Sequence, residues 1–129
     1  MRYMMLIYTK ESESATPEEM REVAQAHWAV MDETNRRGLF CAADPLEPTA
    51  TATTVRVEKG KSLVTDGPFA ETKEQLAGYY ILECKDLDEA LEWAARIPTG
   101  CGGAVGSVEV RPIREIPKPG TAGFASAKA

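Results

Sequence analysis

Two segments of the chain are hydrophobic at most positions and show no alternation of apolar and polar side chains. They span residues 2–8 (RYMMLIY) and 78–84 (GYYILEC). A strand of this composition carries apolar side chains on both faces of its sheet, so both faces need a cover. The two segments are therefore predicted to be strands of a buried sheet. Neither they nor any other stretch is apolar for long enough to cross a bilayer.

A helical period of apolar positions follows the first strand, over residues 17–37. Thr16, Pro17 and Glu19 form a helix start, because a threonine N-cap and a glutamate three residues later satisfy each other's backbone N–H groups. The apolar stripe of this helix consists of Met20, Val23, Ala24, His27, Val30, Met31 and Thr34. We expect this face, with His27 in it, to pack against the sheet.

Turn signals and shorter patterns divide the rest of the chain. They predict a strand at 39–43, a hairpin of strands at 53–57 and 62–65, a helix between Asp86 and Pro98, and a strand at 105–111. The order β-α-β, hairpin, β-α-β predicts an α+β ferredoxin-like sandwich, an antiparallel sheet with two helices on one face. Residues 1–116 form this domain. Residues 117–129, rich in Pro, Gly, Ala and Ser, are expected to be a flexible tail.

The face of this sheet that the helices leave open carries Tyr, Met, Ile and Leu side chains from both hydrophobic strands. A monomer rarely exposes so large an apolar patch. A second copy of the chain is the simplest cover, and a two-fold interface is the commonest arrangement. We therefore expect a homodimer.

Composition narrows the classes of partner and site. The net charge of −5 gives no basic patch for nucleic acid or an anionic membrane, so neither is expected as a partner. Three dispersed cysteines (Cys41, Cys84 and Cys101) and a single histidine do not make a zinc site. We expect no metal, no cofactor and a cytoplasmic location, with reduced thiols and with Cys41 and Cys84 as small core residues.

A long motif connects the chain to a known family. The segment 64–80, VTDGPFAETKEQLAGYY, resembles the signature of DGPF-domain proteins, a branch of the YCII-related family. Shorter matches are YMMLIY at 3–8, TATTVR at 51–56, DEALEWA at 88–94 and VEVRP at 108–112, so the resemblance covers roughly residues 1–115. Ala77 departs from the usual glycine, and the loop 99–106 is longer than usual, which would alter the rim of a pocket.

This resemblance implies a dimeric α/β barrel, in which two ferredoxin-like sheets face each other. It implies no settled reaction, since a fold does not fix a function. Related members have been regarded as possible enzymes because of a histidine and an aspartate near a cleft. Many DGPF proteins look like companions of extracytoplasmic-function sigma factors.

Two residues are candidates for catalysis. His27 can exchange a proton near neutral pH, which suits a general acid or base, but a core histidine with one hydrogen-bond partner fits the same position. Asp66 opens the Asp-Gly-Pro turn, where its carboxylate either orients the imidazole of His27 or caps its own turn. The enzyme hypothesis predicts that the two side chains lie within hydrogen-bond distance in a cleft.

Three residues are candidates for ligand contact. Tyr79 and Tyr80 are consecutive in a strand and therefore face opposite layers, one beneath the helices and one on the open face. Glu74 lies near the turn and would line the rim of a pocket. Core packing is the alternative for the tyrosines and a solvated surface for Glu74. Trp28 and Trp93 are expected to be packing residues.

Two functions follow from this set. One is a cofactor-independent enzyme that acts on a small organic molecule, with His27 and Asp66 as an acid–base pair. The other is a non-catalytic ligand-binding or regulatory accessory protein, associated with a sigma factor. The sequence does not decide whether the protein is an enzyme.

Overall fold

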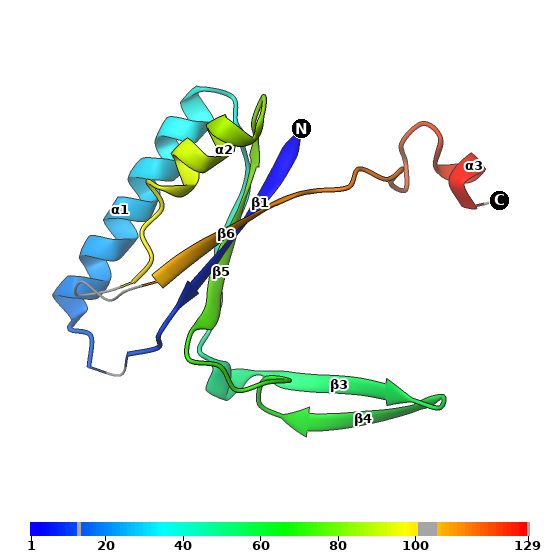
Figure 1. Ribbon diagram of the computed structural model, residues 1–129, viewed down its shortest axis with the longest axis horizontal. Helices are drawn as coiled ribbons and strands as arrows, with labels where there is room; N and C mark the ends of the chain where they lie inside the picture. Colours follow the sequence, from blue (N-terminus) through cyan, green and yellow to red (C-terminus); the bar gives the residue numbers. More distant parts are fainter. Residues whose placement is uncertain (13, 101–105, 129) are drawn as a thin grey trace.

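The computed structural model describes residues 1–12, 14–100 and 106–128. A four-stranded sheet and two helices, α1 and α2, form two layers, and a two-stranded hairpin extends from one end of the sheet (Figure 1). The elements in chain order are β1 (Arg2–Thr9), α1 (Pro17–Arg36), β2 (Phe40–Pro45), the 3₁₀ helix η1 (Thr49–Thr51), β3 (Thr53–Glu58), β4 (Lys61–Asp66), β5 (Gln75–Glu83), α2 (Leu87–Ala94), β6 (Gly106–Pro112) and α3 (Phe124–Lys128).

The main sheet has the strand order β2-β5-β1-β6, and every neighbouring pair is antiparallel. The two hydrophobic segments form the central strands β5 and β1, as their composition predicts. Helices α1 and α2 lie on the same side of the sheet (Figure 1). The predicted α+β class with an antiparallel sheet is thus confirmed, and the strand order is compatible with a ferredoxin-like sandwich.

The core lies between the helices and one face of the sheet. Alternate side chains of β1 and β5 point into it, and the two helices and the turn after α2 supply the rest. Its buried members are Tyr3, Met5, Ile7, Val30, Tyr80, Leu82, Cys84, Ala90, Trp93 and Ile97. The buried Thr34 hydroxyl donates to the carbonyl of Val30 at 2.8 Å, so this polar group is satisfied within its own helix.

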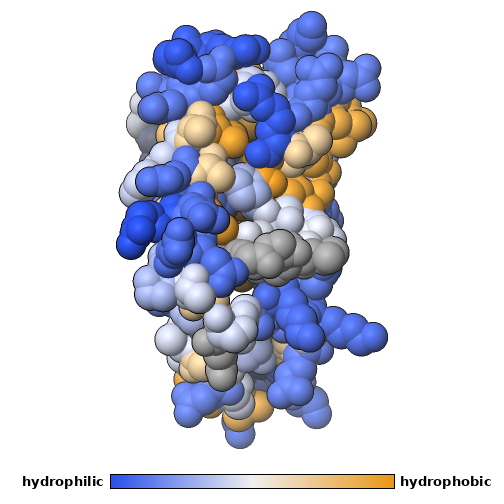
Figure 2. All heavy atoms as spheres, turned by 90° about the vertical axis from the view of Figure 1, so that its left-hand side faces the viewer, coloured by the Kyte–Doolittle hydropathy of each residue, from blue (hydrophilic) through white to orange (hydrophobic). Residues whose placement is uncertain are grey.

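Helix α1 begins as the sequence predicts. The Thr16 hydroxyl accepts a hydrogen bond from the backbone N–H of Glu19 at 3.1 Å, and the Glu19 carboxylate accepts one from the N–H of Thr16 at 3.2 Å. This reciprocal pair is a capping box. The outer face of the helical layer is mostly hydrophilic (Figure 2), so this side of the protein is suited to solvent.

The hairpin β3–β4 forms a sheet of its own. Its turn contains Lys59 and Gly60, which both have positive φ, as tight hairpin turns require. Val55, Val57 and Val64 are exposed and lie on one face of the hairpin, as the pairing of Val55 with Val64 shows. A lone two-stranded hairpin is at best marginally stable in water, and this one presents an apolar face without a cover in the single chain.

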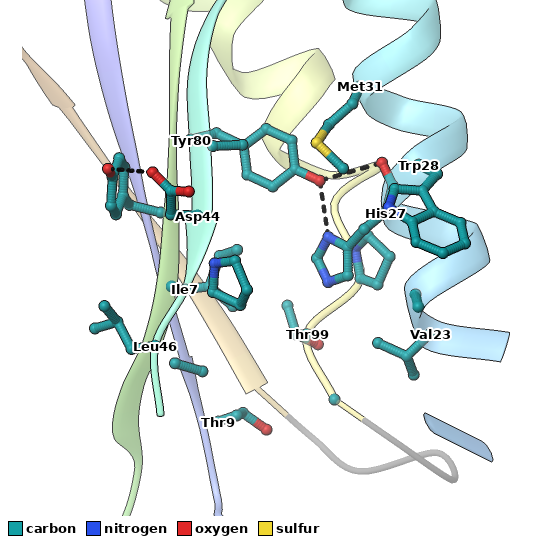
Figure 3. Close-up of a pocket in the computed structure, with 18 of the residues that line it drawn as sticks. Ile7, Thr9, Val23, His27, Trp28, Met31, Asp44, Leu46, Tyr80 and Thr99 are labelled. Carbon is teal, nitrogen blue, oxygen red and sulfur yellow. Dashed lines mark hydrogen bonds between the residues drawn. The ribbon is translucent and has the colours of Figure 1, made fainter. Parts of the chain in front are cut away.

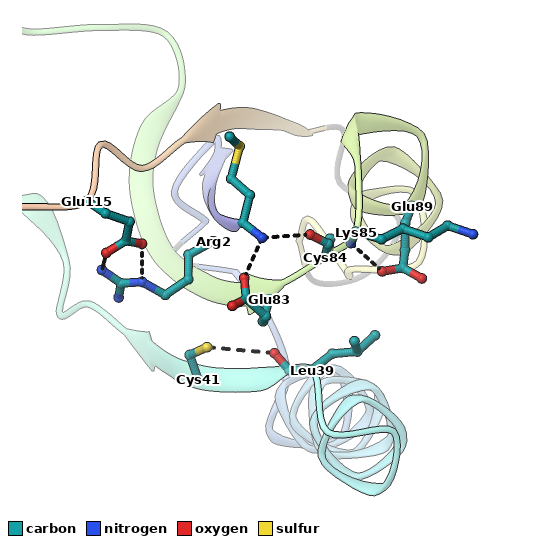
Figure 4. A network of polar contacts seen from close by, with 9 residues as sticks. Arg2, Leu39, Cys41, Glu83, Cys84, Lys85, Glu89 and Glu115 are labelled. Atoms are coloured by element: carbon teal, nitrogen blue, oxygen red, sulfur yellow. Dashed lines mark hydrogen bonds and ion pairs between the residues drawn. The ribbon is translucent and has the colours of Figure 1, made fainter.

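Paired side chains connect the chain that follows β6 to the start of β1. The Arg2 guanidinium donates two hydrogen bonds to the Glu115 carboxylate, at 2.7 and 2.9 Å (Figure 4). The backbone N–H of Ile113 donates to the carbonyl of Arg2 at 2.9 Å. The ion pair is partly exposed and adds little stability by itself, but its two-point geometry fixes the direction of the chain.

Three details differ from the sequence-based expectations. Cys41 is exposed instead of buried, because the β2–β5 pairing skips it at an irregularity between Phe40 and Ala42 (Figure 4 shows its Sγ near the Leu39 carbonyl). Trp28 is 60% exposed and is not a core residue, since it lies at the edge of the apolar stripe. A short helix, α3, occupies part of the tail and buries no residue.

Other expectations are confirmed or fall outside the described residues. Cys84 is buried, and Trp93 is 4% exposed with the guanidinium groups of Arg37 and Arg96 over its ring, at 5.3 and 4.3 Å. Cys101, together with most of the loop 99–106, lies outside the described residues. The flexibility of the tail stays a prediction. No helix in the described parts of the chain combines the length and hydrophobicity needed to cross a lipid bilayer.

Candidate functional site

A cleft of about 550 Å³ opens between helix α1 and the main sheet (Figure 3). This volume falls in the range of small-molecule sites. Most of the residues around it are apolar, and they come from β1, α1, β2, β5 and the segment after α2. The lining residues are Ile7, Thr9, Met20, Val23, Ala24, His27, Trp28, Met31, Ala43, Asp44, Pro45, Leu46, Ala77, Gly78, Tyr79, Tyr80, Pro98, Thr99 and Gly100.

Small side chains create this space. Ala24 on α1, Ala43 on β2 and Gly78 on β5 all line the cleft, where larger residues would fill it. Gly78 also allows β2 to approach β5 closely, because a Cβ atom there would lie 2.8 Å from the carbonyl oxygen of Asp44. The cavity is therefore a consequence of which residues face each other across the helix–sheet interface.

His27 and Tyr80 form the main polar pair of the cleft. His27 Nδ1 lies 2.8 Å from the Tyr80 hydroxyl, and the two rings are stacked with centroids 5.8 Å apart (Figure 3). The helical stripe places His27 on the inner face of α1, and the alternation of β5 places Tyr80 on the inner face of the sheet. The prediction that one of the two tyrosines lies beneath the helices is confirmed.

Burial keeps both groups of this pair neutral. Desolvation lowers the pKa of His27 below its usual 6.5 and raises the pKa of Tyr80 to about 12. The Tyr80 hydroxyl also lies 3.4 Å from the backbone carbonyl of His27, to which it can donate. Whether Tyr80 donates to Nδ1 or to this carbonyl, the second ring nitrogen of His27, Nε2, has no hydrogen-bond partner among the described residues.

The carboxylate of Asp44 does not join this pair. Tyr79 donates a hydrogen bond to Asp44 Oδ2 at 2.7 Å. Asp44 lies on the opposite face of the sheet from His27 (Figure 3), and Tyr79, its partner in the β2–β5 register, shares that face. This contact raises the pKa of Tyr79, chiefly because the neighbouring carboxylate accepts its proton in a hydrogen bond. Tyr79 therefore faces the open side of the sheet.

Asp66 is not brought to His27 within this chain. It is the exposed last residue of β4, where it pairs with Thr53, and it does not line the cleft. The turn that follows is held by other groups: the N–H of Gly67 donates to the Ala52 carbonyl, and the Thr54 hydroxyl donates to the Gly67 carbonyl, both at 2.7 Å. A direct catalytic role for Asp66 stays a prediction.

Glu74 also lies outside the cleft, where it accepts a hydrogen bond from the Ser107 hydroxyl at 3.3 Å.

Sequence reasoning missed Thr9, which continues the inward alternation of β1 past Ile7 and lines the cleft. That alternation was the signal that could have identified it. Within the described parts of the chain, no group of three or more His, Cys, Asp or Glu side chains is placed to hold a metal ion.

Comparison with known proteins agrees with the sequence motif. A curated protein of Rhizobium meliloti, described only as uncharacterised, is 40% identical to this chain over 122 residues, which is 93% of this chain and 97% of that protein. The profile of the YCII-related domain matches residues 1–116. The match includes the β strands, the helices α1 and α2 and the Asp-Gly-Pro turn, and the chain belongs to the YCII-related family.

Proposed function

We propose that this protein acts on a small organic molecule bound in the cleft, with His27 as the group that accepts or donates a proton. The observation that carries this proposal is the 2.8 Å contact between His27 Nδ1 and the Tyr80 hydroxyl at the wall of a 550 Å³ cavity. The contact fixes one nitrogen of the ring and leaves the other for a ligand. Proton transfer of this kind requires no cofactor.

The surroundings of His27 suit a proton-transfer group. The lowered pKa keeps the imidazole neutral at pH 7, so that Nε2 is ready to accept or share a proton. Apolar walls exclude water from the bound molecule and strengthen any polar contact made there. In this proposal Tyr80 is the positioning residue of His27, and Asp66 takes no part in the proton transfer.

A second candidate is a non-catalytic, ligand-binding regulatory protein of the kind that accompanies sigma factors. One observation favours it: within the described residues no carboxylate contacts His27, so nothing stabilises the protonated ring. A cleft with this arrangement would bind a metabolite without converting it. A conformational change of the helices or the sheet on ligand binding would then be the regulatory signal.

Incubation of the protein with a library of small organic metabolites, followed by mass spectrometry and NMR, separates the two candidates. For the enzyme we expect a converted compound, and we expect His27→Gln to lower the rate by about 10²–10⁴-fold while the protein stays folded. Gln25→Glu, a change on the exposed face of α1, is the control and should keep the rate. Full turnover by His27→Gln would exclude the proposed role of His27, and binding without conversion by the wild type would favour the regulatory candidate.

We also propose that two copies form a dimeric α/β barrel of ferredoxin-like sheets. The open face of the sheet carries partly exposed apolar side chains from its two central strands, while the helical side is mostly hydrophilic. These side chains are Met4, Leu6, Tyr8, Tyr79 and Ile81. The apolar face of the hairpin and Phe69, which is 80% exposed, add to the surface that a second copy would cover.

Sedimentation equilibrium at micromolar concentration tests this arrangement. We expect a dimer for the wild type and a monomer for Leu6→Glu, because the substitution buries a charge in the centre of the proposed interface. Leu91→Glu, on the exposed surface of α2, should remain dimeric. A monomeric wild type would rule out the barrel.

A further inference from the structure

The cleft has a second polar group for which the described residues provide no hydrogen-bond partner. The hydroxyl oxygen of Thr9 is buried, and it finds no hydrogen-bond partner among the described residues. Its side chain projects from β1 toward the cavity, at the other end from Tyr80 (Figure 3). A buried hydroxyl without a partner is unusual, because nearly all such groups are satisfied by protein, water or ligand.

The His27–Tyr80 pair and the Thr9 hydroxyl mark two polar ends of the cleft. These ends are well separated along the sheet. Tyr80 pairs with Met5 in the β1–β5 register, and Thr9 is four residues further along β1. Four residues of a strand span on the order of 13 Å. The residues between the two ends are apolar, such as Ile7, or small, such as Gly78.

The described lining offers no charge to a ligand. It contains no lysine or arginine, and its single carboxylate, Asp44, is directed to the other face of the sheet and engaged with Tyr79. His27 is kept neutral by burial. An ion that enters such a cavity loses its hydration and gains no opposite charge in return, which disfavours its binding.

We infer that the ligand is an uncharged, elongated and mainly apolar molecule with a hydrogen-bonding group at each end, one for His27 Nε2 and one for the Thr9 hydroxyl. This inference rests on the proposed function, since it assumes that the cleft binds a small molecule at His27. It adds the chemical class of that molecule and assigns Thr9 as a residue that selects it.

Three rigid probes with the same biphenyl skeleton test the ligand class: para-phenylphenol, para,para′-dihydroxybiphenyl and biphenyl-para-carboxylate. Because His27 is the single histidine of the chain, its ring NMR signals are identified without further assignment and report binding directly. We expect both neutral probes to shift these signals. The dihydroxy probe should bind about three- to tenfold more tightly than the monohydroxy one, as one added hydrogen bond implies, and the carboxylate at least roughly tenfold more weakly.

Two variants make the test specific. Thr9→Val removes the hydroxyl at constant shape, so it should abolish the advantage of the dihydroxy probe and leave the affinity for para-phenylphenol unchanged. Thr65→Val, on the exposed strand β4, is the matched control and should change neither value. Ala24→Leu should fill the cavity and prevent binding of all probes, whereas Ala29→Leu, on the exposed side of the same helix, should not.

The outcomes distinguish this inference from the function on which it rests. Preferential binding of the carboxylate with a shift of the His27 signals would overturn the ligand class and leave the proposed cleft site intact. An unchanged preference for the dihydroxy probe in Thr9→Val would overturn the role of Thr9. If none of the probes shifts the His27 signals, both the ligand class and small-molecule binding at His27 are contradicted.

Discussion

His27 and Tyr80, which are 53 residues apart in the sequence, contact each other through both a side chain and the backbone. The Tyr80 hydroxyl lies 2.8 Å from His27 Nδ1 and 3.4 Å from the carbonyl of the same residue. The Tyr80 hydroxyl thereby contacts both the ring of His27 and the backbone of helix α1 at the same residue. This contact fixes α1 to β5 where the two elements are separated by the cleft.

Removal of the Tyr80 hydroxyl should destabilise the protein. In Tyr80→Phe the partly buried Nδ1 of His27 loses its partner, which we expect to lower the free energy of unfolding by about 1–3 kcal/mol. Tyr79→Phe removes a more exposed hydrogen bond, to Asp44, and should cost less. Urea denaturation of both variants measures the difference. Equal costs for the two would show that the Tyr80 contact contributes nothing beyond a surface bond.

The titration of His27 should make stability depend on pH. Its pKa in the folded protein lies below 6.5, the value of the unfolded chain, because burial disfavours the charged ring. As the pH falls below 6.5, the unfolded state binds a proton before the folded state does, so this contribution to stability is lost toward acid pH. Thermal unfolding at pH 7 and below should show a smaller loss for His27→Gln than for the wild type. An NMR titration of the His27 ring with a pKa above 6.5 would contradict this sign.

The thiols should differ in reactivity. Burial raises the pKa of Cys84 to about 11, and the residue is inaccessible, whereas Cys41 is exposed on an edge strand. In a Cys101→Ser background, a colorimetric thiol reagent should therefore label one cysteine rapidly and the second after addition of denaturant. Peptide mapping should identify the rapid site as Cys41. Rapid labelling of Cys84 in the folded protein would show that the end of β5 opens readily.

The capping box at the start of α1 should contribute measurably to stability. Thr16→Ala removes the hydroxyl that accepts the N–H of Glu19, and we expect a loss of about 1 kcal/mol. Thr16→Ser keeps the hydroxyl and should lose little. The comparison by chemical denaturation assigns the effect to the cap instead of to the methyl group. A loss of the same size in Thr16→Ser would contradict this assignment.

The parts of the structure that follow from local sequence were the predictable ones. Helix α1 was predicted at 17–37 and is observed at Pro17–Arg36, because Thr16 and Glu19 act over three residues. The hairpin was likewise predictable, because its turn is specified by residues that are adjacent in the sequence. Neither depends on which segments meet in space.

The parts that depend on distant contacts were harder to predict. His27 was predicted as a candidate site residue from its helical face, and that role stays a prediction. Its hydrogen-bond partner is Tyr80 and not Asp66, since no local pattern specifies which strand residue lies opposite a helix residue. Cys41 was expected in the core, but a one-residue irregularity in strand pairing turns it outward. A pairing defect of this kind has no clear sequence signal.

The different burial of the two tryptophans gives the protein two separate optical probes. Trp28 is 60% exposed at the lining of the cleft, and Trp93 is 4% exposed beneath two arginines. A soluble quencher will therefore reduce the fluorescence of Trp28 and spare that of Trp93. Emission from Trp28 will respond to occupation of the cleft, while emission from Trp93 will respond to loss of the core. The single-tryptophan variants Trp93→Phe and Trp28→Phe then report ligand binding and unfolding separately, through Trp28 in the first and Trp93 in the second.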